Sequence, residues 1–169
     1  MSDIIQLLEE MRASSGDAVT IGLPNNVILD FANRDSNIVR AIEEGHSKQS
    51  EFNSEHLMMH ETELISHLQE DFVNFYSPAT VNPYVAISAR GPWVVTSHGA
   101  VLHDNGGYGM LGGGHGPSEI IDVMSENHVM ANVMTASFSQ ARLAEALKKE
   151  LGHTRGSCPF SKFICMNSG

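Results

Sequence analysis

Apolar residues recur at helical spacing through most of the first half of the chain. The pattern over residues 3–13 has its apolar positions three and four residues apart: Ile4, Ile5, Leu7, Leu8 and Met11. Ser2 or Asp3 can cap the helix that this spacing predicts. A weaker pattern covers residues 35–45, and the longest covers residues 54–75. The first 76 residues are therefore predicted to be mostly helical, with Gly16 and Pro24 interrupting the pattern.

After Pro78 the pattern changes to short apolar runs separated by turn residues. Three runs have the length and composition of β-strands: Tyr84–Ala89, Trp93–Thr96 and Ala100–His103. The pairs Gly91-Pro92 and His98-Gly99 lie between them, and such pairs are typical of turns. The sequence therefore predicts a small antiparallel meander.

A glycine-rich stretch follows the meander and leads to two further predicted helices. Pro117 suits the first position of a helix. Four apolar residues predict the buried face of this helix: Ile120, Ile121, Val123 and Met124. The next helix begins at Ser137 or Ser139 and ends at Gly152, after two lysines in its last turn.

The last ten residues contain an apolar run, Phe163–Met166, which predicts a buried strand. Asn167, Ser168 and Gly169 follow, residue types that cap a helix and present backbone N–H groups. A strand that leads into such a turn can bind an anion, because the N–H groups and the helix dipole point the same way. A helix and more strands would be expected next, so the chain is expected to be part of a longer polypeptide.

The net charge limits the partners of the chain. Ten basic and twenty acidic residues give a charge of −10, which argues against a nucleic-acid or anionic-membrane surface but permits a local site for a small anion. Cys158 and Cys165 are too few for a disulfide framework. No apolar run approaches the roughly 18 residues of a membrane span, and no basic signal peptide is recognisable, so a cytoplasmic protein is expected.

Two motifs have a functional and a structural interpretation. Gly107–Gly112 matches the spacing GxGxxG, but the preceding strand is short and the helix cannot begin before about Pro117, too late to hold a pyrophosphate. These glycines are better explained by close approach of the backbone to another chain or a ligand. Four residues have spacing that can bind a metal: His56, His60, Glu63 and His67. Because no HExxH motif is present, an exposed polar helix face is the preferred interpretation.

Three histidines lie in or beside the predicted turns: His98, His103 and His115. For each, a hydrogen-bonded structural role is favoured over a catalytic one, and His115 within the glycine-rich stretch is the most interesting. No GxSxG motif supports a serine nucleophile.

Residues from about 84 to 169 resemble the N-terminal part of class III aminotransferases, the pyridoxal-phosphate enzymes that include the ornithine, 4-aminobutyrate and lysine ε-aminotransferases. Five segments in order carry the resemblance: Val85–Gly91, the stretch ending in His103-Asp104, Gly112–Pro117 with its helix, Phe138–Leu147 and Phe163–Gly169. The resemblance implies an α/β fragment of a fold-type I aminotransferase. It divides the chain into a helical extension or arm over residues 1–76, a small antiparallel sheet segment over 77–104, and a glycine loop with the start of a truncated cofactor domain over 105–169.

The resemblance also implies site residues and partners. Ser168 and Gly169 would bind the phosphate of pyridoxal 5'-phosphate, while Tyr108 and Tyr84 fall where the family has active-site aromatic and substrate-facing residues. Homodimers with active sites at the interface are expected, with an amino donor and a 2-oxo acid as substrates. The lysine that forms the Schiff base lies beyond Gly169 in the family, in the remaining C-terminal polypeptide. No catalytic residue and no metal site are therefore assigned, and the chain alone is expected to be inactive.

A second hypothesis belongs to a different class of protein. The chain could be a stand-alone, non-enzymatic interaction module whose helical first half binds a partner or a metal.

Overall fold

The helix α3, Ser36–Gln49, packs across the first two strands of a three-stranded sheet. The computed structural model describes residues 2–73, 77, 84–105, 112–129 and 135–165. These residues form two compact units, Met1–Ser125 and Glu126–Gly169, which are described separately. The sequence-based boundaries after residues 76 and 104 both fall inside the first unit. Seven α-helices and one antiparallel sheet occur in the described ranges, so the predicted α/β class is confirmed.

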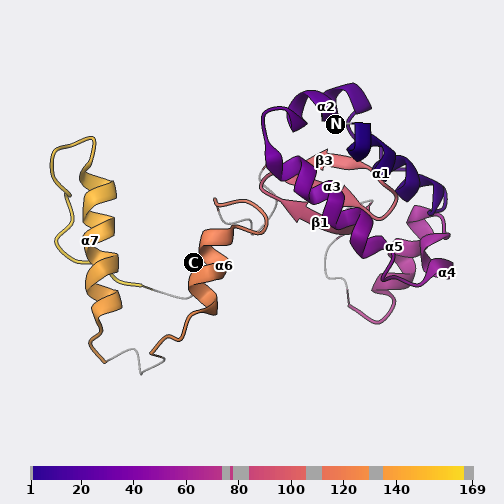
Figure 1. Cartoon of the computed structure of the whole chain (residues 1–169). Helices are drawn as coiled ribbons and strands as arrows, with labels where there is room; N and C mark the ends of the chain where they lie inside the picture. The colour runs from indigo at the N-terminus through magenta and orange to yellow at the C-terminus, as the bar shows by residue number, and fades with distance from the viewer. Residues whose placement is uncertain (1, 74–76, 78–83, 106–111, 130–134, 166–169) are drawn as a thin grey trace. The chain divides into compact units, whose positions relative to one another are not determined.

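The sheet is a meander in the order β1-β2-β3. Its strands are Ala86–Arg90, Trp93–Thr96 and Val101–His103, each antiparallel to the next (Figure 1). The prediction of three short strands here is confirmed. All four residues of β2 are buried, as expected for the central strand.

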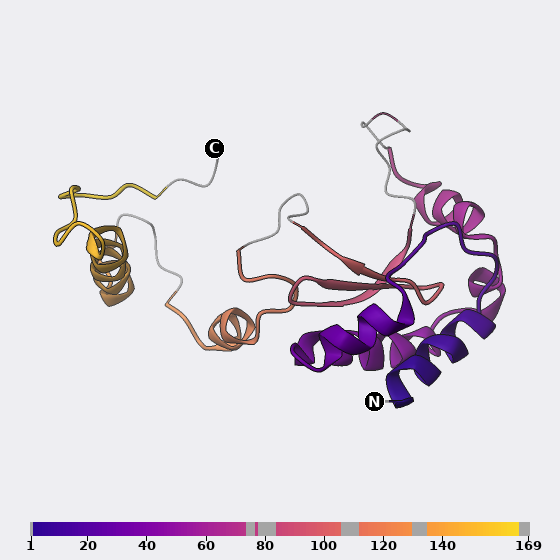
Figure 2. The ribbon, with the colours of Figure 1, turned by 90° about the horizontal axis from the view of Figure 1, so that it is seen from above.

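Of the helices that precede the sheet in sequence, three lie on one of its faces: α1 Ser2–Ala13, α2 Asn25–Ala32 and α3 (Figure 2). They enclose the core with the inner face of the sheet. Its fully buried members come from all these elements: Leu8, Met11, Ile28, Ile38, Ala41, Ile42, Val95 and Val101. The three helices therefore form a layer that covers one face of the sheet.

The closest contact between α3 and the sheet involves Gly45. A Cβ at this position would lie 2.8 Å from Ser88 Oγ on β1, closer than packed side chains approach. The Ser88 hydroxyl donates to the Ala41 carbonyl at 2.5 Å, one turn earlier on α3. Glycine at position 45 thus lets the helix lie directly against the strand.

The first turn of α3 is tied to the sheet through Asp35. The Asp35 carboxylate caps the helix by accepting from Asn37 N–H at 2.9 Å, and it also accepts from the Trp93 indole N–H at 2.7 Å. Burial raises the pKa of this carboxyl, but the hydrogen bonds from Trp93 and Asn37 lower it by more, so the pKa lies below its ordinary value.

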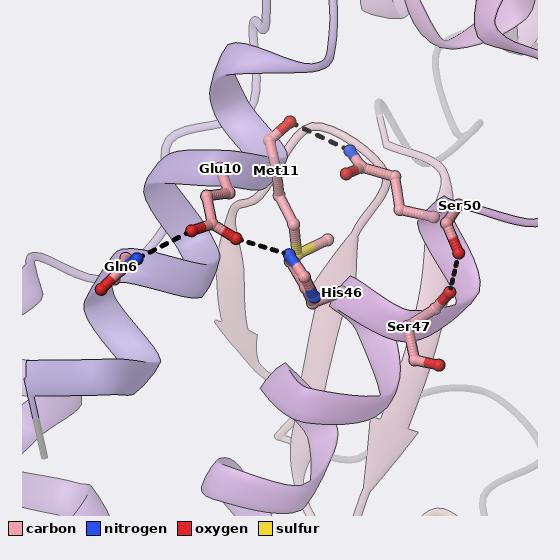
Figure 3. Close-up of polar contacts among 7 residues, drawn as sticks. Gln6, Glu10, Met11, His46, Ser47 and Ser50 are labelled. Atoms are coloured by element: carbon pink, nitrogen blue, oxygen red, sulfur yellow. Dashed lines mark hydrogen bonds and ion pairs between the residues drawn. The ribbon is translucent and has the colours of Figure 1, made fainter.

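The last turns of α1 and α3 are joined by polar contacts. Glu10 accepts a hydrogen bond from Gln6 at 2.9 Å and contacts His46 Nε2 at 2.8 Å, and these two contacts hold its pKa below the ordinary value (Figure 3). The buried Gln49 amide donates to the Met11 and Ser97 carbonyls, both at 2.9 Å. One side chain of α3 thus links α1 to the β2–β3 turn.

The helical half differs from its prediction in two places. Pro24 interrupts the helical pattern, as predicted, but it also stands at the N-cap of α2, a helix that the spacing did not predict. The predicted helix over 54–75 is instead two short helices, α4 Ser54–Leu57 and α5 Glu61–Gln69, and residues 70–73 are not helical. The interruption has a local cause, because the His60 ring accepts from Thr62 N–H and starts α5 afresh.

The two helices predicted for the second half are confirmed in position, but the predicted burial of the first is not. The helices α6 Ser118–Ser125 and α7 Phe138–Gly152 are present, and Ser137 caps α7 in a capping box with Gln140. However, the predicted buried face of α6 is exposed, from 39% at Ile120 to 75% at Met124.

Residues 162–165 form no strand and are mostly exposed, so the predicted buried strand is wrong there, while Met166 lies outside the described residues. No neighbouring strand in the described part supplies the ladder that this run would need.

Glu61 is a fully buried carboxylate at the start of α5. Its Oε2 accepts from the backbone N–H groups of Val19 and Thr20 at 2.8 and 2.7 Å, and its own N–H donates to Asp17 O at 2.9 Å. The segment between α1 and α2 is therefore attached to α5 through this residue.

We predict that Glu61→Ala lowers the free energy of unfolding by about 2–4 kcal/mol, because two backbone N–H groups lose their acceptor. Glu61→Gln, which keeps an acceptor oxygen, should cost less. The control is Glu43→Ala on the exposed face of α3, which should change stability by about 0.5 kcal/mol or less. Urea unfolding of the three variants measures the difference, and equal losses for Glu61→Ala and Glu43→Ala would contradict the role of Glu61.

Candidate functional site

A groove of about 500 Å³ lies at the outer edge of β3. One wall is the segment from Ile21 to Pro24, and the other is β3 with the residues that follow it. Its lining comprises these residues: Ile21, Gly22, Leu23, Pro24, Tyr84, Val94, Val101, Leu102, His103, Asp104 and Asn105. A mostly apolar hollow with a few polar groups is typical of a small-molecule site.

Backbone pairing positions the first wall. Leu23 N–H donates to the Val101 carbonyl at 2.8 Å, so the extended segment before α2 lies along the free edge of β3. This pairing covers the start of the strand, and the groove extends toward His103 and Asp104 at its end. The edge strand is thus partly covered by the chain itself.

The polar end of the groove contains His103, Asp104 and Asn105. His103 Nδ1 lies 2.6 Å from Asn105 Oδ1, and the imidazole packs edge-on against Trp93 with ring centroids 4.8 Å apart. Trp93 also contacts the Phe31 ring at 4.9 Å. The groove therefore connects through His103 to the aromatic part of the core.

Asp104 also contacts the glycine segment. Its Oδ2 lies 3.1 Å from His115 Nε2, and the two side chains are 21% and 32% exposed. His115 is held in place by its backbone, because its N–H and C=O pair with those of Gly91 at 2.8 and 2.9 Å. The segment after the meander thus returns to the groove residue Asp104.

Arg90 provides a second attachment of the same segment. Its guanidinium donates to the Gly116 carbonyl at 3.1 Å and forms an ion pair with Glu44 of α3 at 2.7 Å. The hydrogen bond and charge of Glu44 raise the pKa of Arg90 further.

Gly114 is required by the close approach of this segment to the meander. Its φ is +74°, and a Cβ would lie 2.9 Å from backbone atoms of Gly91. Close approach was expected for the glycines of Gly107–Gly112, but a Cβ at Gly112 would meet nothing within 4 Å, and residues 106–111 lie outside the described residues. The close approach is instead made by Gly114, to the chain's own β1–β2 turn.

Of the residues predicted for the site, Tyr84 lines the groove. Tyr108, Ser168 and Gly169 lie outside the described residues. Asp104 was missed as a site residue, although its position directly after a predicted strand was a usable signal. Segment 21–24 gave no sequence signal of a role in the groove.

The other candidate residues have structural contacts. His98 is buried, with Nδ1 3.0 Å from Ser97 Oγ and Nε2 3.1 Å from the Met59 carbonyl. His56 and His67 contact each other with ring centroids 4.6 Å apart. Within the described ranges, no group of three or more His, Cys, Asp or Glu side chains is arranged to hold a metal ion.

The comparisons with known proteins give no family. No protein-family model, no curated protein and no solved structure matches the chain. Among the described residues, none of the helices has the length and apolar character needed to cross a membrane.

We predict that Gly114→Ala releases the glycine segment from the β1–β2 turn, because alanine at positive φ costs about 1–2 kcal/mol and its Cβ would also overlap with Gly91. The amide protons of Gly91 and His115 should then exchange faster with solvent. Gly112→Ala is the matched control, since a Cβ there meets nothing within 4 Å. Unchanged exchange in Gly114→Ala would show that the close approach is not needed.

Proposed function

We propose that this chain is the N-terminal part of a class III, fold-type I aminotransferase. The intact enzyme would move an amino group from an amino acid or amine to a 2-oxo acid with pyridoxal 5'-phosphate. The order of structural elements supports this proposal. Three of the four described segments of the resemblance form regular elements in the structure, namely the meander, α6 after the glycine segment, and α7.

The observation that carries the proposal is the attachment of the glycine segment to the meander. The backbone pairs of Gly91 and His115, together with the close approach of Gly114, join two of the resembling segments into one arrangement directly before α6.

The groove supports a division of roles between its residues and those predicted for the cofactor. Tyr84, assigned to the substrate side, lines it beside the Asp104 carboxylate. A carboxylate there does not fit a dianionic phosphate, so the phosphate remains assigned to Ser168 and Gly169. When bound, the cofactor supplies the electron sink for amino-group transfer, and this chain's part is to bind and orient.

The proposal includes further polypeptide that carries the Schiff-base lysine, and a homodimer in the cytoplasm. Apolar side chains exposed on α6 and α7 are surfaces that such an assembly would cover, with Met124 75% and Phe138 87% exposed. Both cysteines are free, which suits a reducing compartment.

The same exposed residues also favour the second candidate, a non-enzymatic interaction module. In that case α6 or α7 would bind a partner protein directly, without cofactor. The metal-binding form of this hypothesis has no support in the described residues.

The two candidates differ in cofactor binding. We predict that the polypeptide expressed with whatever follows Gly169 in its gene binds pyridoxal phosphate, and that borohydride attaches the cofactor permanently to one lysine. Peptide mass mapping should find that lysine outside residues 1–169. The chain of 169 residues alone is the control and should gain no stoichiometric label. No labelled lysine in the longer polypeptide at saturating cofactor would refute the enzyme hypothesis.

A further inference from the structure

We infer that Asn105 is a modification site, where the side-chain amide is lost through a succinimide and His103 promotes the reaction by a hydrogen bond to the amide oxygen. This inference goes beyond the proposed function. It requires only Asn105, the residue that follows it and their neighbours in the unit Met1–Ser125, so it holds whether or not the chain belongs to a pyridoxal-phosphate enzyme.

The sequence distinguishes Asn105 from every other asparagine of the chain, because it alone is followed by glycine. A succinimide forms when the backbone nitrogen of the following residue attacks the carbonyl carbon of the asparagine side chain. A side chain on that following residue hinders the approach, whereas glycine has none. Gly106 lies outside the described residues, and only its lack of a side chain matters here.

The structure places a hydrogen-bond donor on the amide that would react. His103 Nδ1 lies 2.6 Å from Asn105 Oδ1. Because an amide oxygen only accepts, the hydrogen of this bond is carried by Nδ1, and a neutral imidazole can supply it. A donor on the carbonyl oxygen makes the carbonyl carbon more electrophilic and stabilises the negative charge that the oxygen acquires in the tetrahedral intermediate.

Trp93 orients the imidazole that makes this bond. The His103 ring packs edge-on against the indole, with ring centroids 4.8 Å apart and an angle of 85° between the planes. The indole itself is buried, and its N–H donates to Asp35 at 2.7 Å. The donor is therefore already oriented before the reaction begins, and no rearrangement is needed when charge develops on the amide oxygen.

The reaction needs only water as a co-reactant. The Gly106 nitrogen forms a bond to Cγ of Asn105, and the electron pair of the C=O bond moves to Oδ1. The pair then returns, the Cγ–Nδ2 bond breaks, and ammonia leaves with the proton that the backbone nitrogen gives up. Water opens the ring at either of its two carbonyl carbons, which yields aspartate or isoaspartate. Asn105 and His103 are both exposed, so water reaches the ring.

The modification changes the groove beside β3, because Asn105 belongs to its lining. An uncharged amide is replaced by a carboxylate beside the His103 imidazole. In isoaspartate the main chain also gains one carbon atom at the start of the glycine-rich stretch. The groove of a newly made chain therefore differs in charge from the groove of an aged one.

The experiment incubates the whole 169-residue chain at neutral pH and follows each asparagine by peptide mass mapping, with electron-transfer fragmentation to distinguish isoaspartate from aspartate. We expect Asn105 to be converted first, with isoaspartate among its products. Asn53 is the internal reference, because its side-chain oxygen also accepts a hydrogen bond, from Glu55 N–H at 2.9 Å, but serine follows it. An intact Asn105, earlier conversion of Asn53, or aspartate without isoaspartate would overturn the inference.

Two variants of matched shape test the hydrogen bond, His103→Asn and His103→Leu. Both lose the ring that packs on Trp93, but only the first keeps an N–H donor near the place of Nδ1. Conversion of Asn105 should be about three- to tenfold slower in His103→Leu than in His103→Asn, as expected for the loss of one hydrogen bond. Equal rates, or a faster rate in His103→Leu, would refute the role of His103.

The rate at Asn53 in the same samples is the control for a general change in stability and should be equal in both variants. Circular dichroism identifies a variant that has not folded, and His103→Phe then replaces His103→Leu, with the same slower conversion expected. Because all these measurements are made without cofactor, failure of the aminotransferase hypothesis would leave their outcome unaffected.

Discussion

Direct contact between α3 and the first two strands is the constraint on which the unit Met1–Ser125 depends. Ala41 and Gly45 bring the helix backbone against β1, and the Ser88 hydroxyl bonds to α3 where a larger side chain would separate them. The buried residues of α1 and α2 then pack around this pair of elements. Because interiors are densely packed, a change at this contact would be felt across the core.

Buried and half-buried polar groups hold the ends of the helix layer in register with the sheet. Asp35 ties the start of α3 to Trp93, while Gln49 ties its end to α1 and the β2–β3 turn. Glu61 fixes the segment that precedes the groove wall. Each of these groups bonds to backbone or to a single side-chain donor, so each position is specified by hydrogen bonding as well as by apolar area. The groove is a consequence, since both its walls belong to segments held in this way.

The sequence predicts where the helices and strands lie better than it predicts what packs against them. Helical spacing correctly located α1, α3, α6 and α7, and turn residues located all three strands, because these signals depend on local periodicity. The helix over 54–75 failed because His60 caps a new helix inside a pattern that continues across it. The exposed apolar faces of α6 and α7 show that periodicity identifies a face suited to burial but not what covers it. For the site, Tyr84 could be chosen from sequence, whereas the role of Asp104 depends on His115 and on a segment eighty residues earlier in the chain.

Native-state hydrogen exchange tests the central claim most directly. If contact between α3 and the sheet holds the unit together, amides from Ala41 to Gly45 and in β2 should exchange only by global unfolding. Those of α6 and α7 should exchange about a thousandfold faster or more, since their apolar faces are exposed. Exchange from α3 as fast as from α6 would contradict the account.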